Sequence, residues 1–171
     1  MKPNILYREQ IQKVKFYYPE LQTINIEIVY GKISTTMACR PLLLKSMLFG
    51  KRCYRIFINN NSDFGGVLLE DVPYNAQLGV IGHEFSHILD YETKSNLGII
   101  YLGIKYLFKK YKRTYERSID KLTIQKGLGP QLYDWAIFSM YESKASDKYK
   151  KFKRDIYMSH HDIMQYMLLQ H

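Results

Sequence analysis

The sequence predicts an α+β fold in which a small twisted mixed sheet packs against a set of helices. Segments with strand-like alternation are confined to the first part of the chain, and from Pro73 onward the apolar residues recur at helical spacing. The chain has 171 residues, of which 46% are hydrophobic, so it is long enough to bury a sizeable core. We therefore expect a single domain that spans residues 1–171.

The first part of the chain predicts one helix followed by strands. Residues 7–17 carry apolar side chains at helical spacing and predict an amphipathic helix. Residues 23–30 alternate apolar and polar side chains and are rich in Ile, which is typical of a half-buried strand. Residues 52–59 predict a second strand, and the Gly65-Gly66 turn then leads into the short apolar segment 67–69.

The rest of the chain predicts helices. The first of these runs from Pro73 to about Tyr91, with Asp71 as the expected cap. Its apolar face consists of Leu78, Ile81, Phe85, Ile88 and Leu89. Further helices are expected over residues 96–112, from Thr114 to just before Gly127, over residues 131–144, and after Ser159.

The helix from Pro73 contains the run His83-Glu84-Phe85-Ser86-His87. Residues four apart lie about 40° from each other around a helix, so both imidazoles can bind one Zn²⁺ from the same face. Glu84 is displaced by about 100° from His83, where it can take a proton from a metal-bound water. Because the apolar face points away from the histidines, the core can hold the helix while it presents the metal.

A third ligand must come from elsewhere in the chain. A metzincin would place Gly and then a ligand at the positions of Asp90 and Thr93, so that class is excluded. Glu116 and Asp120 are four residues apart on a predicted helix and share one face. Such a pair is by itself more typical of a solvated helix face. The zinc motif, however, needs a carboxylate ligand and a second acceptor, and this pair can supply both.

The two motifs together, His83-Glu84-x-x-His87 and Glu116-x-x-x-Asp120, resemble those of the gluzincin zinc metallopeptidases. The closer likeness is to the minimal gluzincins and to the soluble core of the heat-shock-protease and CAAX-prenyl-protease branch. In that branch a glycine commonly ends the glutamate helix, as Gly127 would here. The likeness covers about residues 50–130.

This resemblance implies a zincin-like fold and a peptidase that hydrolyses peptide bonds with a Zn²⁺-bound water activated by Glu84. It implies Glu116 as the third zinc ligand and Asp120 as the acceptor for the Nδ1–H of His83. Its partner would be a peptide or protein substrate. The resemblance further implies that a strand before the zinc helix lies at the rim of the cleft and pairs with an extended substrate. Residues 52–59 or 67–69 could serve, although 52–59 could equally be an ordinary core strand.

Peptidases of this kind use a His or Tyr side chain to stabilise the oxyanion of the tetrahedral intermediate. Our candidate is His160, near the carboxyl end of the chain. The other candidates are His161, Tyr133, Tyr141 and the neighbouring Tyr157. Ser159 and Asp162 also form a helix-capping pattern, in which case the two histidines would simply be surface residues of a first helical turn.

The chain is basic, with a formal net charge of +9. Two basic stretches, residues 105–117 and 144–154, are interleaved with aromatic residues. Such stretches can follow a nucleic-acid backbone, but they also suit a solvated face with snorkelling lysines, and we favour the solvated face. The rivals to a peptidase are a non-catalytic domain that binds nucleic acid and a protein-interaction module with a closed zinc site.

The remaining features predict a cytoplasmic protein. No apolar run approaches the roughly 18 residues of a membrane-spanning helix, and no secretory signal is visible. Cys39 and Cys53 are too few for a disulfide framework. Membrane members of the resembling branch carry hydrophobic spans between the two motifs. Here the 28 intervening residues hold one short helix interrupted by Lys105, which favours a soluble or at most peripheral enzyme.

Overall fold

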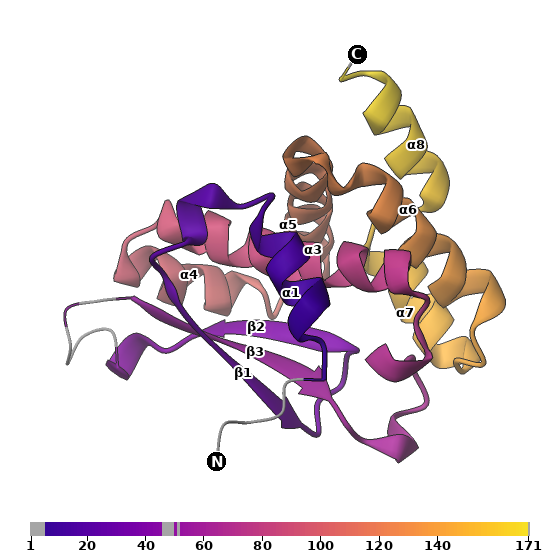
Figure 1. Ribbon diagram of the computed structural model, residues 1–171, viewed down its shortest axis with the longest axis horizontal. Coiled ribbons are helices and arrows are strands. Elements are labelled where there is room, and N and C mark those ends of the chain that lie inside the picture. Colours follow the sequence, from indigo (N-terminus) through magenta and orange to yellow (C-terminus); the bar gives the residue numbers. More distant parts are fainter. Residues whose placement is uncertain (1–5, 46–49, 51, 171) are drawn as a thin grey trace.

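The computed structural model describes residues 6–45, 50 and 52–170, and it confirms the α+β class (Figure 1). Short 3-10 or π turns are labelled η. In chain order the described elements are α1 (Arg8–Lys15), η1 (Pro19–Leu21), β1 (Asn25–Gly31), β2 (Met37–Pro41), β3 (Cys53–Asn59), η2 (Ser62–Phe64), η3 (Leu69–Asp71), α3 (Tyr74–Glu92), α4 (Asn96–Lys105), α5 (Lys109–Thr123), η4 (Ile124–Leu128), α6 (Gly129–Ile137), η5 (Phe138–Glu142), α7 (Asp147–Ile156) and α8 (His160–Leu168).

The described strands form a three-stranded mixed sheet in the order β1-β3-β2. β3 runs parallel to β1 and antiparallel to β2. Alternate side chains of β3, those of Tyr54, Ile56 and Ile58, are buried, and the helices lie along one side of the sheet (Figure 1). Arg55 instead pairs with Glu27 of β1 at 2.7 Å. β3 therefore shows the alternation of a half-buried strand, whereas β1, for which that alternation was predicted, is partly exposed at every position from Ile26 to Val29.

The edge strand β2 was not predicted, and it changes which strand can meet a substrate. β3 has a neighbour on both sides in the described sheet, so of the two alternatives left open for residues 52–59 the ordinary core strand holds, and the substrate-pairing strand does not. Residues 67–69 form no strand, because Leu69 begins η3. β2 has the sequence Met-Ala-Cys-Arg-Pro, which lacks the β-branched and aromatic residues that signal a strand.

Helix α3 runs through the core, and every residue from Ala76 to Ile88 is buried. Its glycines allow close contact with the elements beside it. A Cβ atom at Gly79 would lie 2.2 Å from the Gln131 carbonyl oxygen of α6. Asp71 does not cap this helix, because it belongs to η3 and the N-cap position is Pro73.

Helices α4 and α5 correct a second expectation. The helix predicted over residues 96–112 is interrupted at Phe108, whose backbone is extended. α4 therefore ends before it, and α5 begins at Lys109. The break allows Leu102 of α4 to pack with Tyr115 and Ile119 of α5 in a small second core. Helix α8 begins with the expected capping box of Ser159 and Asp162. Among the described residues, no helix is long and apolar enough to cross a bilayer.

Candidate metal centre

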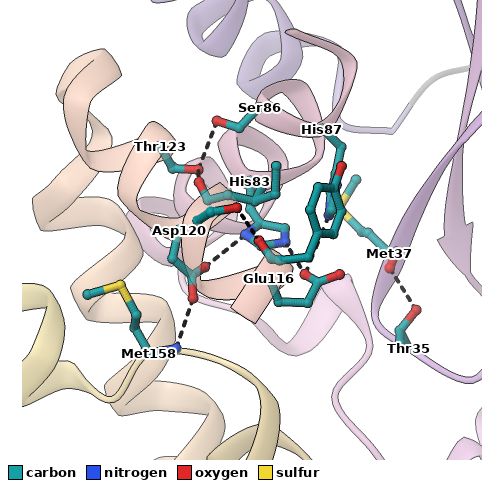
Figure 2. Close-up of polar contacts among 12 residues, drawn as sticks. Thr35, Met37, His83, Ser86, His87, Glu116, Asp120, Thr123 and Met158 are labelled. Atoms are coloured by element: carbon teal, nitrogen blue, oxygen red, sulfur yellow. Dashed lines mark hydrogen bonds and ion pairs between the residues drawn. The ribbon is translucent and has the colours of Figure 1, made fainter. Parts of the chain in front are cut away.

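Helices α3 and α5 bring the three predicted metal ligands together in the interior (Figure 2). The candidate ligand atoms of His83, His87 and Glu116 all lie within 4.8 Å of one another. The Glu116 Oε2 atom is 3.0 Å from His83 Nε2 and 3.5 Å from His87 Nε2. All three side chains are buried, so the group could hold a metal ion shielded from solvent.

The donor set fits zinc better than it fits the hard cations. Two imidazole nitrogens and one carboxylate are the protein ligands of catalytic Zn²⁺ sites, which leave a fourth position open. Mg²⁺ and Ca²⁺ prefer sites made of oxygen ligands. No sulfur ligand belongs to the group, which also argues against a closed, cysteine-rich structural site.

Asp120 fixes the orientation of His83 from behind (Figure 2). Its Oδ1 atom lies 2.9 Å from His83 Nδ1, and its Oδ2 atom accepts a hydrogen bond of 2.9 Å from the backbone N–H of Met158. Burial opposes a charge on His83, but the hydrogen bonds with Asp120 and Glu116 raise its pKa to about 10. With Nδ1 held by Asp120, Nε2 faces Glu116 and the centre.

The other two ligands have partners that the sequence analysis missed. The Nδ1 atom of His87 is 3.4 Å from the Tyr115 hydroxyl, which donates to Asp90 Oδ2 at 2.7 Å. The hydroxyl of Tyr106 donates to Glu116 Oε1. Asp90 and Tyr115 lie on the helices that carry the ligands and close to ligands in the sequence. Their positions could therefore have indicated that they contact the centre. Tyr106 follows α4 and carries no such signal.

A second set of contacts fixes α3 against α5 next to the centre. The hydroxyls of Ser86 and Thr123 are 2.9 Å apart (Figure 2). The hydroxyl of Tyr18 donates to the Gly82 carbonyl oxygen at 2.8 Å and lies 2.8 Å from Ser86 Oγ. Because these groups are buried and paired, they set the relative position of the helices that carry the ligands.

Glu84 lies beside the ligands and does not belong to the group that could hold the metal. Its side chain is buried, and burial raises the pKa of its carboxyl above the ordinary value, against the opposing effects of His87 and His83. It also lies near the backbone of Cys39 in β2. A carboxylate with a raised pKa next to a metal is suited to accept and return a proton.

Two cavities meet at these residues. One has a volume of about 360 Å³ and the other about 430 Å³. Both are lined by Thr35, Met37, His83, Glu84 and Tyr157. The first extends along apolar side chains such as Trp135 and Phe152, and the second along β2 from Ala38 to Pro41. The candidate metal centre thus lies where the two cavities join, with an edge strand beside it.

Two of the oxyanion candidates, His160 and Tyr157, lie in different surroundings. His160 lines the first cavity and packs against the rings of Tyr133 and Tyr141, and no hydrogen bond links it to a metal-centre residue among those described. Tyr157 lines both cavities, and its ring centroid lies 5.6 Å from that of His83. Burial raises the pKa of Tyr157 well above its ordinary value, so its hydroxyl keeps its proton. A catalytic role for His160 stays a prediction.

Comparisons of this chain with protein families, curated proteins and solved structures find no match. A function must therefore be inferred from the donor set, the side chains that orient it, and the cavities that reach it.

Proposed function

We propose that this protein is a zinc-dependent metalloendopeptidase of gluzincin type. The observation that carries the proposal is the buried group of His83, His87 and Glu116, with Glu84 beside it and cavities leading to it. A structural zinc site is closed by four protein ligands, whereas this group supplies three and leaves one position open. An open position next to a carboxylate is suited to hydrolysis.

Each residue has a role in this proposal. When bound, Zn²⁺ supplies a water with a lowered pKa and a Lewis acid for the substrate carbonyl. Glu84 accepts the proton of the attacking water and returns it to the leaving amine. Its raised pKa brings it closer to neutral pH, where it can do both. With Zn²⁺ bound, His83 would be neutral, and Asp120 would accept its Nδ1–H so that Nε2 is left for the metal.

The substrate in this proposal is an extended peptide. β2 is the edge of the described sheet and lines the second cavity, so a peptide can add to it as a further strand. The apolar lining of the first cavity would receive a hydrophobic side chain. Tyr157 is the donor to the oxyanion that the geometry favours, and His160 is the alternative.

The direct test combines metal analysis with one substitution. Protein purified without chelators should contain equimolar zinc, and so should the Glu84→Gln variant. The unaltered protein should cleave a peptide library and Glu84→Gln should not, because this substitution keeps the ligands and removes the proton acceptor. Chelation should stop cleavage, and added zinc should restore it. Glu70→Gln is a matched control, since Glu70 is exposed in η3 and lies outside the ligand group.

Each other outcome identifies a rival. Protein without bound metal overturns the zinc centre. Stoichiometric zinc without cleavage of any peptide favours a non-catalytic zinc-containing interaction module. Tight, salt-sensitive binding to polyanions that is unchanged in Glu84→Gln, again without cleavage, favours a nucleic-acid-binding domain.

A further inference from the structure

The surface around α4 exposes an unusual number of apolar side chains. Among the described residues, six large exposed hydrophobic side chains fall within a segment of 12 residues. They are Leu97, Ile100, Tyr101, Ile104, Leu107 and Phe108, which we call the α4 surface. Leu97 is 79% exposed and Leu107 is 83% exposed. Exposed apolar patches of this kind mark sites of contact with another molecule.

Within α4 the exposed side chains Leu97, Ile100, Tyr101 and Ile104 form one stripe, and Leu107 and Phe108 follow the helix. Leu97, Ile100 and Ile104 follow helical spacing, so they lie along the same side of α4. The opposite side of the helix, with Ile99 and Leu102, is buried. The helix therefore has two apolar faces, and only one of them is covered by the described chain.

The charge around this stripe has one sign. Residues 93–114 contain no Asp or Glu and carry six basic residues. These are Lys94, Lys105, Lys109, Lys110, Lys112 and Arg113. Lys94 pairs with Asp90 and Lys109 pairs with Asp155, whereas no ion pair within the described part of the chain involves the other four. The segment keeps a net positive charge next to its exposed apolar side chains.

The covered side of α4 borders the second cavity. Ile99, Leu102 and Gly103 line that cavity together with His87 and Glu116. A molecule that docks on the α4 surface would therefore lie close to the candidate metal centre, with only α4 between them.

We propose that the α4 surface docks on an anionic lipid bilayer, with α4 lying in the interface. Anionic bilayers bind helices that combine an exposed apolar stripe with aromatic residues and flanking lysines, as α4 does. A second copy of this chain is disfavoured because it would bring two positive segments together. The contact is peripheral, since none of the described helices can span a bilayer. The docking does not depend on the proposed peptidase activity.

The test measures sedimentation of the full chain with vesicles, using Glu84→Gln protein so that catalysis plays no part. Vesicles of phosphatidylcholine with phosphatidylglycerol should bind the protein, and vesicles of phosphatidylcholine alone should bind it less. Ile104→Asn with Leu107→Asn should weaken binding by about tenfold or more, because two apolar side chains no longer enter the interface. Leu168→Asn with Leu169→Asn is the matched control, since those side chains are 71% and 80% exposed on and after α8.

Two double substitutions that remove positive charges test the electrostatic part of the binding. Lys110→Gln with Arg113→Gln should weaken binding to the anionic vesicles and reduce its dependence on salt, whereas Lys144→Gln with Lys148→Gln should change it little. All of these residues are exposed, so the variants should keep the circular dichroism of the parent.

Failure to bind anionic vesicles overturns the proposal, as does an equal loss in the α4 and control variants. A stable oligomer that depends on Ile104 and Leu107, or binding to an acidic protein in place of vesicles, also overturns it. Because no arm requires hydrolysis, failure here leaves the proposed peptidase function to its own test.

Discussion

The chain carries two pairs of histidines, and the fold gives them different surroundings. His83 and His87 are buried on α3, with the carboxylate of Glu116 between them and that of Asp120 behind His83. His160 and His161 begin α8, with ring centroids 4.1 Å apart. Their closest ring partners are tyrosines and each other.

The difference shows what turns a histidine pair into a candidate metal centre. The rings of His160 and His161 are closer together than those of His83 and His87, which are 4.8 Å apart, yet only the latter pair belongs to a possible ligand group in the described chain. The carboxylate of Glu116, which a second helix contributes, completes that group, and closeness of the rings does not.

Zinc binding should depend on the pair His83 and His87 and not on the pair His160 and His161. His87→Ala and Glu116→Gln should each reduce the zinc content of purified protein to background, because two ligands do not hold the ion. His161→Ala should keep the zinc content of the parent, since His161 is exposed and outside the ligand group. Metal analysis with circular dichroism measures both effects, and a loss of zinc in His161→Ala would contradict the contrast.

Substitution of the two oxyanion candidates, Tyr157 and His160, should also have different effects on catalysis. If Tyr157 donates to the oxyanion, Tyr157→Phe should lower kcat about 100- to 1000-fold with little change in zinc content. His160→Gln should then have a small effect on kcat. The opposite result, with a large loss only in His160→Gln, would assign the role to α8 instead. Peptide hydrolysis under saturating substrate distinguishes the two.

The Asp120 carboxylate should affect the affinity for zinc although it is not a ligand. Asp120→Asn should weaken zinc binding about 10- to 100-fold, because the amide supports the His83 tautomer less well than a carboxylate does. Asp162→Asn is the comparable change beside the other histidine pair and should leave zinc affinity unaltered. Competition with a chelator of known affinity measures both, and equal affinities for the two variants would refute the role of Asp120.

The tight packing of α3 should appear in stability. Gly79→Ala should lower the free energy of unfolding by about 1–3 kcal/mol, because the new methyl group meets the backbone of Gln131. Gly103→Ala on α4 is the control, since a Cβ there meets nothing within 4 Å. It should be neutral or stabilising by up to about 1 kcal/mol. Denaturant unfolding gives both values.

The helix of the second pair depends on its cap. Ser159→Ala should lower the free energy of unfolding by about 1 kcal/mol, because the Asp162 backbone N–H loses its acceptor. Zinc content should not change, since α8 contributes no member of the ligand group. A loss of zinc in this variant would show that α8 supports the metal centre after all.

Most helices could be predicted from the sequence because their signals are local. The spacing of apolar residues gave α1 and α3 to within a few residues, and the Ser159–Asp162 pattern gave the start of α8. The break at Phe108 could not be predicted, because it depends on how Leu102 packs against α5. β2 could not be predicted either, since its backbone pairing with β3 imposes an extended form on residues that do not favour it.

The local spacing of residues is enough to place His83, Glu84 and His87 on one helix and to put Glu116 and Asp120 on a common face of another. These are consequences of helical periodicity, which acts over a few residues. The folded arrangement is needed to see that the two faces meet, that Tyr106 and Tyr115 complete the surroundings of the ligands, and that β2 borders them. Those contacts join residues distant along the chain, so packing between elements determines them and local spacing cannot.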